Sequence, residues 1–250
     1  HAEIFEYAKR LGLEAFSTPF DSSAVDFLEN LGVSIYKIAS FENTDLPLIR
    51  KVAQTGKPVI VSIGLASISE VGEAVEAARD AGAKDIVLLK TTSSYPATAE
   101  NANIATIEHM RKAFNCEVGI SDHTLGIGVA LASVALGATV IEKHLTLDRA
   151  DGGVDSEFSM NPHELRAIVD EAPRVQAAIG TVSYGPTNSE INSLKFRRSL
   201  YFSKSVAAGD TLDLSNVRAV RPGFGLPTKY LETILGMKVS RNVEIGEPVS

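Results

Sequence analysis

Two histidines stand at the ends of successive predicted strands and are the clearest candidates for chemistry. His123 lies in the run Gly119-Ile-Ser-Asp-His-Thr124, and His144 lies in Val140-Ile-Glu-Lys-His-Leu-Thr146. Because they are one strand-helix unit apart, their side chains can meet above the mouth of a barrel and bind one divalent cation. Two protein ligands leave coordination positions open for substrate and water, as a catalytic metal requires. The alternative is a pair of histidines that are only hydrogen-bonded.

Hydroxyl and lysine side chains gather where the other predicted strands end. They lie in Ser17–Phe20, Tyr36–Ser40, Val61–Gly64 and Lys90–Pro96. Such groups on one rim suit a phosphate or carboxylate, which they hold by charge-assisted hydrogen bonds. Two alternatives remain open at this point. The hydroxyls can instead cap helices, and Lys37 or Lys90 can instead form a Schiff base, as in a class I aldolase.

Two loops add charged side chains. The acidic segment Asp151–Ser159 follows the last predicted strand of the first region and places Asp155 where it can touch a polyhydroxy substrate, although turn formation alone would also use these residues. Arg221-Pro-Gly-Phe-Gly puts an arginine on a stiff loop further along the chain, and its alternative is a solvated turn arginine.

The elements that position these residues repeat as a short apolar run, a polar turn and a helical pattern. The predicted strands are Glu14–Thr18, Ser34–Ser40, Pro58–Ile63, Asp85–Thr91, Glu117–Ser121 and Ala138–His144. The predicted helices are Ser22–Leu31, Asp45–Thr55, Ser69–Ala81, Ile104–Phe114, Gly126–Leu136 and Pro162–Ile179. This spacing predicts an α/β fold of parallel strands, either a (β/α)8 barrel without its first two units or an open doubly wound sheet. Both arrangements put chemistry at the carboxyl ends of the strands.

The pattern changes after Ile179. Residues 182–191 are rich in turn formers and predict a linker between a barrel region, 1–181, and a second domain, 192–250. That second domain has short alternating runs at Ser199–Ser203, Thr211–Leu214 and Val217–Val220, with one short helix near Pro227–Leu235. These runs predict that the second domain is small and β-rich.

Composition excludes several classes of function. The 250 residues carry a net charge of −7 and no lysine or arginine run, which argues against nucleic acid as a partner. The single cysteine, Cys116, excludes an internal disulfide and fits the cytoplasm. The uncharged stretch Thr124–Ile141 is interpreted as a buried helix and strand, not a membrane span. The chain begins at His1 within a helical pattern, and we expect it to be a fragment.

The ordered motifs of this chain resemble the N-acetylneuraminate synthase family of nonulosonic (sialic-type) acid synthases. They are Phe16-Ser-Thr-Pro-Phe, Tyr36-Lys-Ile-Ala-Ser, Gly119-Ile-Ser-Asp-His-Thr, Glu142-Lys-His, Ser159-Met-Asn-Pro, Arg197-Arg-Ser-Leu-Tyr and Val220-Arg-Pro-Gly-Phe-Gly. The last two are similar to the SAF (antifreeze-like, β-clip) domain that ends proteins of this family. Gly153-Val-Asp-Ser-Glu-Phe-Ser and Lys90-Thr-Thr-Ser-Ser-Tyr-Pro look most like the pseudaminic acid branch.

The resemblance implies a (β/α)8 barrel, here without its first two units, that condenses phosphoenolpyruvate with an open-chain amino-sugar aldehyde and releases phosphate. For the pseudaminic branch the sugar is 2,4-diacetamido-2,4,6-trideoxy-L-altrose. N-acetylneuraminate or legionaminate synthesis is the nearest alternative, and a Schiff-base aldolase or a non-catalytic sugar-binding module are further ones. By the same resemblance, His123 and His144 hold Mn²⁺ or another cation such as Mg²⁺ or Co²⁺.

The remaining site residues are also carried over from the resemblance. Those matching positions that hold phosphoenolpyruvate are Thr18, Lys37, Ser40, Ser62 and Ser121, and Ser93 stands where the sialic branch carries asparagine. Those matching sugar contacts are Phe20, Glu42, Tyr95 and Asp155, with Glu42 and Asp155 as proton-transfer groups. Arg221 matches an arginine that the SAF domain offers to the active site of the partner subunit, which implies a swapped homodimer.

Overall fold

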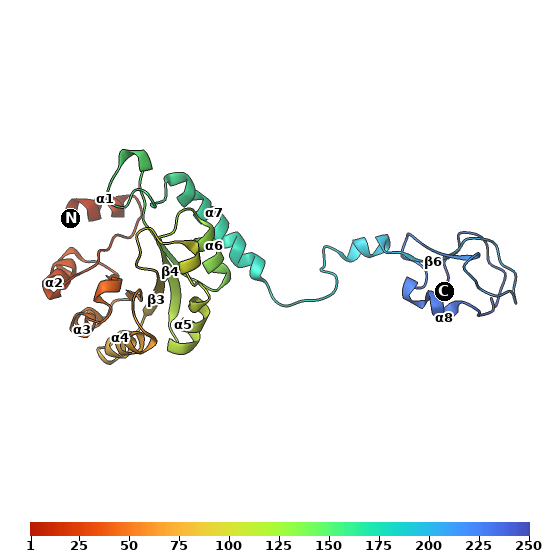
Figure 1. Cartoon of the computed structure of the whole chain (residues 1–250), viewed down its shortest axis with the longest axis horizontal. Helices are drawn as coiled ribbons and strands as arrows, with labels where there is room; N and C mark the ends of the chain where they lie inside the picture. Colours follow the sequence, from red (N-terminus) through yellow and green to blue (C-terminus); the bar gives the residue numbers. More distant parts are fainter. The chain divides into compact units, whose positions relative to one another are not determined.

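The computed structural model describes residues 1–250 and divides them into two compact units, His1–Gly180 and Thr181–Ser250. The first unit is built on a five-stranded parallel sheet whose strand order, β1-β2-β3-β4-β5, follows the chain (Figure 1). The strands are β1 (Tyr36–Ile38), β2 (Val59–Ser62), β3 (Ile86–Thr91), β4 (Glu117–Asp122) and β5 (Val140–Lys143). A sheet without a reversal of strand order is the barrel arrangement, so the doubly wound alternative is excluded.

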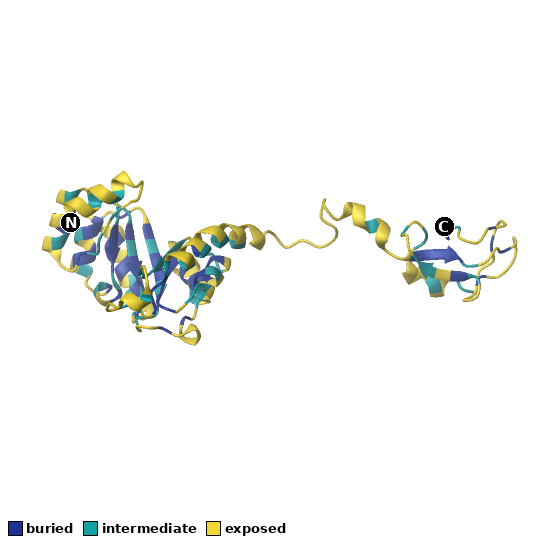
Figure 2. Ribbon diagram, turned by 90° about the horizontal axis from the view of Figure 1, so that it is seen from above, coloured by how far each residue is buried: buried dark blue, intermediate teal, exposed yellow.

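Helices cover the outer face of this sheet (Figures 1 and 2). They are α1 (Ala2–Arg10), α2 (Ser22–Leu31), α3 (Leu46–Ala53), α4 (Ile68–Asp80), α5 (Thr106–Phe114), α6 (Gly128–Ala135) and α7 (Pro162–Ile179). The apolar sides of α2 to α5 and the outward residues of the strands form the main core, which includes Ile38, Val61, Leu88 and Ile120, whereas α6 and α7 pack around a smaller cluster of Ala130, Met160 and Ile168. Strands β1 to β4 are largely buried between the helices outside and side chains inside, whereas all four residues of β5 are only half-buried.

The ends of the helices follow from their capping residues. Asp21 accepts a hydrogen bond from the amide of Ala24 and starts α2, and Gly32 ends it in the left-handed conformation. Ser67 and Asn161 each form a capping box with the glutamate three residues later, at the start of α4 and α7. These caps satisfy amide groups that the first turn of a helix leaves without partners.

The sheet is curled, so that its two outermost strands face each other across its inner side. Lys37 on β1 and Glu142 on β5 form an ion pair of 3.3 Å between Nζ and Oε2, although three strands separate them within the sheet. The inside is tightly packed, because a Cβ atom on Gly119 would overlap the carbonyl oxygen of Val140 and the side chain of Leu89. The fold is therefore of the predicted barrel type.

Glu14–Thr18 is not a strand, which corrects one prediction. The segment has no partner in any β-ladder, and no residue of it is fully buried. Its apolar run has strand character, but an extended segment counts as a strand only when a neighbour accepts and donates its backbone hydrogen bonds. The uncharged stretch Thr124–Ile141 does contain the predicted helix and strand, α6 and the start of β5, but they are not fully buried as expected, because α6 buries only Ala130, Ser133 and Val134 and β5 is half-buried. No helix of the structure is long and apolar enough to cross a bilayer.

The second unit has its own small core. Antiparallel strands β6 (Ser199–Phe202) and β7 (Val217–Val220) pair from Ser199↔Val220 to Phe202↔Val217, and the short helix α8 spans Leu231–Ile234. The buried apolar residues are Leu200, Phe202, Val206, Leu212, Val217, Ile234, Val239, Val243 and Val249. The predicted run Thr211–Leu214 makes only a single bridge, from Thr211 to Lys238. Most of this β-rich unit is thus held by isolated bridges and turns.

Candidate active site

Side chains on the inner face of the sheet meet at the carboxyl ends of the strands. Lys37 is only 7% exposed, and its ammonium group lies beside one carboxylate oxygen of Glu142. Ser121 donates its hydroxyl to the other oxygen, at 2.6 Å. The register pairs Ser121 with Glu142, so the two residues share one face of the sheet. Glu142 was not predicted as a site residue, although the two-residue alternation along a strand puts it on the same face as His144.

A cluster of serine hydroxyls lies beside this ion pair in the sheet. The Ser40 hydroxyl accepts a hydrogen bond of 3.2 Å from the amide of Gly64. Gly64 has no room for a side chain, because a Cβ atom there would overlap the hydroxyl oxygens of Ser40 and Ser93. The Oγ atoms of Ser62 and Ser93 are buried and have no hydrogen-bond partner within the protein. Buried hydroxyls without partners are uncommon, and here two of them lie on the same rim as a buried lysine.

Asn43 holds the backbone that presents this cluster. Its side-chain amide is buried and donates to the carbonyl groups of Ser62, at 3.2 Å, and Gly64, at 2.9 Å. Asn43 was not predicted as a site residue, because it acts by donating to carbonyl groups at the end of a different strand, β2. A polar residue in the loop after β1 is typical of any loop and does not indicate this contact.

The two histidines come together as predicted from their spacing. Their ring centroids are 5.2 Å apart and the rings are nearly perpendicular. His123 Nδ1 lies 2.9 Å from the carbonyl oxygen of Thr92, and His144 Nδ1 lies 3.2 Å from a carboxylate oxygen of Asp155. Since both partners are acceptors, each Nδ1 is the donor of its contact, and in the neutral imidazole the Nε2 lone pair is then available to a ligand. Burial lowers the pKa of the His123 imidazole, which favours the neutral, ligating form.

This donor set fits a catalytic divalent cation. Two neutral imidazoles are suitable ligands for first-row transition metals, and their other nitrogens are oriented by a carbonyl and a carboxylate, as in known metal sites. No group of three or more His, Cys, Asp and Glu side chains converges in a way that could hold a metal by itself. A cation at His123 and His144 would therefore complete its coordination with substrate oxygens and water.

Aromatic side chains flank the histidines. The ring of Tyr95 packs on His123 with centroids 4.3 Å apart, and Phe158 packs on His144 with centroids 5.1 Å apart. Tyr95 is about half exposed, whereas Phe158 is 4% exposed. Phe158 was not predicted as a site residue, because an apolar residue in a polar loop gives no chemical signal.

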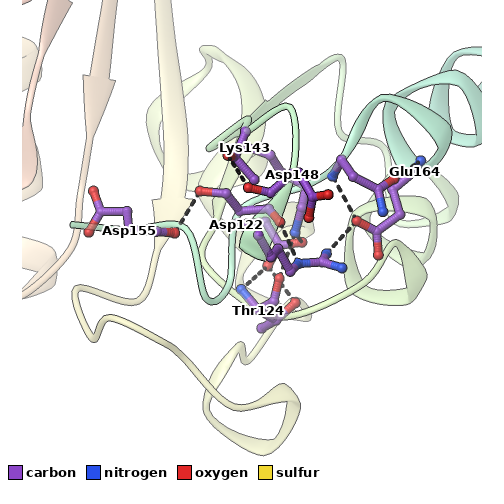
Figure 3. A network of polar contacts seen from close by, with 10 residues as sticks. Asp122, Thr124, Lys143, Asp148, Asp155 and Glu164 are labelled. Atoms are coloured by element: carbon purple, nitrogen blue, oxygen red, sulfur yellow. Dashed lines mark hydrogen bonds and ion pairs between the residues drawn. The ribbon is translucent and has the colours of Figure 1, made fainter. Parts of the chain in front are cut away.

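The acidic loop that carries Asp155 is anchored to the start of α7. Arg149 donates to the carbonyl oxygen of Ser159 at 3.0 Å and forms an ion pair with Glu164, whose carboxylate also accepts from the amide of Asn161 (Figure 3). These contacts fix the end of the loop, and Asp155 reaches back to His144. Asp155 thus lies in the mouth, where its type and position were expected.

The other predicted residues are less tied to this group. Glu42 follows β1 and has one buried carboxylate oxygen, Oε2, without a partner. Thr18, the last residue of the segment that is not a strand, is half-buried, and Phe20, two residues later, is 66% exposed. Arg221 is exposed in the second unit, so the first unit forms its group of polar residues without it.

Lys90 lies on the other face of β3. It pairs in register with Ile120, which belongs to the core on the helix side, and it lines a small cavity together with Ala102 and Ile120. Its ammonium group donates to the carbonyl oxygen of Thr91. Burial lowers the pKa of Lys90, but the side chain points away from the inner face that carries Ser121 and Glu142.

The curled sheet and the polar inner rim define an α/β-barrel protein whose site lies at the carboxyl ends of its strands. Residues 1–184 match the NeuB family, and residues 197–250 match the SAF domain. The chain therefore belongs to the NeuB family and carries a SAF domain, as its motifs predict.

Named relatives are similar over almost the whole chain. A pseudaminic acid synthase of Campylobacter jejuni is 38% identical over 99% of this chain and 72% of its own length. An N,N'-diacetyllegionaminic acid synthase of the same species is 37% identical over 99% of this chain and 75% of its own length. The crystal structure of N-acetylneuraminic acid synthetase from Leptospira borgpetersenii, in complex with citrate, has a TM-score of 0.72 and 35% identity over 78% of this chain and 68% of that chain.

Proposed function

We propose that this protein is a nonulosonic acid synthase, which condenses phosphoenolpyruvate with an open-chain amino-sugar aldehyde and releases phosphate. The observation that carries the proposal is one group of residues on one rim. A buried lysine and two unpartnered buried hydroxyls, those of Ser62 and Ser93, lie on the same inner face as a pair of histidines with free Nε2 atoms. An anion pocket beside a cation site is what this reaction requires.

The anion pocket receives phosphoenolpyruvate. Lys37 supplies the positive charge, and the hydroxyls of Ser40, Ser62, Ser93 and Ser121 donate hydrogen bonds to phosphate and carboxylate oxygens. Thr18 extends the same rim. Because the Ser62 and Ser93 hydroxyls have no protein partner, an anion gains their hydrogen bonds without breaking others.

His123 and His144 hold the cation, for which Mn²⁺ is our first choice and Mg²⁺ or Co²⁺ the alternatives. A divalent cation supplies Lewis-acid polarisation of the aldehyde oxygen. Asp155 keeps His144 oriented and is within reach of protons on the sugar, and Glu42 offers a carboxylate oxygen without a protein partner. These two carboxylates transfer protons as the carbon-carbon bond forms and water adds. Phe20 and Tyr95 line the sugar side.

Within the family we propose the pseudaminic type, with 2,4-diacetamido-2,4,6-trideoxy-L-altrose as the sugar. The support is the motif Lys90-Thr-Thr-Ser-Ser-Tyr-Pro, in which Ser93 replaces asparagine, and the pseudaminic acid synthase among the most similar relatives. The legionaminic relative is almost as similar, so synthesis of legionaminate or N-acetylneuraminate is the alternative.

We further propose a homodimer in which the SAF unit of one subunit covers the mouth of the other and brings Arg221 to the sugar. Exposed apolar side chains on the loops at the carboxyl ends of the strands support a covering partner. They are Phe20, Phe41, Leu65, Leu125, Leu147 and Val154. An apolar rim around a polar site is typical of a surface that another protein unit covers. A mixture of His123→Ala and Arg221→Ala chains should then regain activity that neither variant has alone.

We also propose that the enzyme works in the cytoplasm. Burial raises the pKa of the Cys116 thiol, the only cysteine, which keeps it protonated and unreactive. A single cysteine forms no disulfide within these 250 residues, which is typical of proteins in a reducing compartment.

The test is phosphate release from phosphoenolpyruvate by the full-length protein, with the altrose-type sugar or N-acetylmannosamine, with and without Mn²⁺. Manganese-dependent release with only the altrose-type sugar supports the proposal as stated. Phosphate release with N-acetylmannosamine would instead indicate N-acetylneuraminate synthesis, the sialic branch of the family. Activity that survives EDTA and is trapped by borohydride at Lys37 or Lys90 would instead establish the Schiff-base aldolase. If the His123→Ala variant releases phosphate at the wild-type rate, the proposed metal site is excluded.

A further inference from the structure

A fully buried ion pair joins the two residues that directly precede the histidines in the sequence, Asp122 and Lys143. Lys143 Nζ is 2.8 Å from Asp122 Oδ2, and both side chains are 1% exposed (Figure 3). All other ion pairs of the chain are more exposed than this one. Neither Asp122 nor Lys143 has a part in the proposed chemistry, so their burial needs another explanation.

The sheet register relates this pair to the histidines. Asp122 on β4 is the register partner of Lys143 on β5. His123 and His144 are the next residues along the two strands, so their side chains leave the opposite face, into the mouth. The ion pair thus joins β4 to β5 at the last paired position before the histidines, and any shift of one strand end relative to the other would change the distance between the two imidazoles.

The same two side chains also hold the backbone after His123. Asp122 Oδ1 accepts from the Thr124 amide at 2.9 Å and from the Thr124 hydroxyl at 2.7 Å, while Lys143 Nζ donates to the Thr124 carbonyl oxygen at 2.8 Å. His123 is therefore fixed on both sides, and one of the contacts that fix it comes from the strand of His144. The backbone of His144 is held independently, since its carbonyl oxygen accepts from the amide of Met160 at 2.8 Å.

We infer that the Asp122–Lys143 ion pair positions the histidines, fixing the end of β4 against the end of β5 so that both Nε2 atoms meet one divalent cation. This inference rests on the proposed function, because it takes His123 and His144 as cation ligands. A buried ion pair loses hydration, and an uncharged pair of similar size is often as stable. Stability alone therefore does not require these charges, whereas the geometry of the histidine pair does.

The test separates geometry from stability. The single variant Lys143→Met leaves a carboxylate buried and unpaired, so it should lower both the melting temperature and the affinity for Mn²⁺. The double variant Asp122→Asn/Lys143→Met removes that charge while the asparagine oxygen can still accept from Thr124. We expect it to regain most of the melting temperature, yet to bind Mn²⁺ about tenfold more weakly, as for other supporting residues of metal sites.

The measurement is the dissociation constant for Mn²⁺, obtained from the electron paramagnetic resonance signal of the free ion, together with the melting temperature of the metal-free chain. Lys143→Arg, which keeps the charge, should stay within a few-fold of the wild-type dissociation constant. Lys57→Met is the matched control, since it removes an ion pair with Glu29 at the other end of the strands and should not change the dissociation constant.

Three outcomes would contradict the inference. If the double variant binds Mn²⁺ as tightly as the wild type, the pair is only structural and the proposed function is unaffected. If Mn²⁺ affinity and melting temperature fall and recover together in all variants, the pair again acts through stability alone. If the wild-type chain binds no Mn²⁺, the metal in the proposed function fails and this inference fails with it. Should the double variant not fold, Thr124→Val carries the test, with about threefold weaker binding expected and unchanged binding as the contrary result.

Discussion

Lys37 and Glu142, on the first and last strands of the sheet, face each other across the inner side at 3.3 Å. Ser121 donates to the second carboxylate oxygen of Glu142. The Glu142 carboxylate thus contacts the same lysine and hydroxyl that we assign to phosphoenolpyruvate. At the proposed site, the phosphoenolpyruvate anion would take the place of this carboxylate, whose side chain is 38% exposed.

Removal of the Lys37 ammonium group should weaken anion binding while the protein still folds. In Lys37→Met, phosphoenolpyruvate should bind about 10- to 100-fold more weakly, because a hydrogen bond to a charged group contributes about 1.5–3 kcal/mol. Isothermal titration of the chain with phosphoenolpyruvate measures this. The control is Lys57→Met, because Lys57 forms an ion pair with Glu29 away from the mouth. Equal affinity in Lys37→Met and wild type would remove Lys37 from the site.

A methyl group on Gly64 should block the serine cluster. Its position overlaps the Ser40 and Ser93 hydroxyls, which can rotate away, so Gly64→Ala should fold but bind phosphoenolpyruvate at least about tenfold more weakly. In the control Gly72→Ala, on α4, the new methyl group would meet only the ring of Phe114 at 3.8 Å. That control should gain up to about 1 kcal/mol of stability, since glycine is unfavourable inside a helix. Tight binding by Gly64→Ala would argue that the anion lies elsewhere.

The substitutions Asp155→Asn and Asp155→Ala should separate two roles of Asp155, proton transfer and orientation of His144. Asp155→Asn keeps an oxygen that can accept from His144 Nδ1 but cannot take up a proton, so we expect near-normal Mn²⁺ affinity with phosphate release lowered about 100-fold or more. Asp155→Ala also loses the orienting contact and should weaken Mn²⁺ binding about tenfold or more. If both variants release phosphate at the wild-type rate, Asp155 has no part in proton transfer.

The acid stability of the first unit should depend on Glu29. Burial alone would raise the pKa of this carboxyl group, but hydrogen bonds from Lys57 and Tyr36 outweigh burial and lower it from 4.5. A lowered folded pKa contributes stability above the unfolded pKa, and this contribution is lost as the pH falls through the folded value. Because the Glu29 side chain is 39% exposed and solvent screens its ion pair, Glu29→Gln should be less stable than wild type at pH 7 by about 0.5 kcal/mol, and the difference should shrink below pH 4.5. Urea unfolding followed by circular dichroism, at pH 7 and at a pH below 4.5, measures the free energy of unfolding of both proteins. A stability difference that grows as the pH falls would contradict this prediction.

Helices were predictable where their ends carry chemical signals. The predicted bounds of α2 and α7 agree with the structure, because Asp21 and Gly32 delimit the first, and Asn161, Pro162 and Gly180 the second. The observed strands were found from their apolar runs, with ends that differ from the predicted ones by at most two residues. Glu14–Thr18 failed as a strand because pairing depends on a neighbour elsewhere in the chain, which a local pattern does not contain.

The site was predictable only in part, for the same reason. His123 and His144 could be paired from sequence because the unit repeat fixes where strand ends lie. Glu142, Asn43 and Phe158 were missed because each acts through a contact with a residue from a different unit of the repeat. The relation of Arg221 to the mouth depends on how two units associate, which no local pattern encodes.

The contact between Lys37 and Glu142 also bears on how the chain folds. Neighbouring strand-helix units can associate early, because their contacts are close in sequence, whereas these two residues come from opposite ends of the sheet and close a long loop. This ion pair therefore exists only after β5 has joined, whereas the residues of the proposed anion pocket lie on or after β1 to β4. A ligand in that pocket selects the assembled β1 to β4 and stabilises it by mass action, so the rate at which a refolding chain becomes able to bind phosphoenolpyruvate reports the assembly of these four strands.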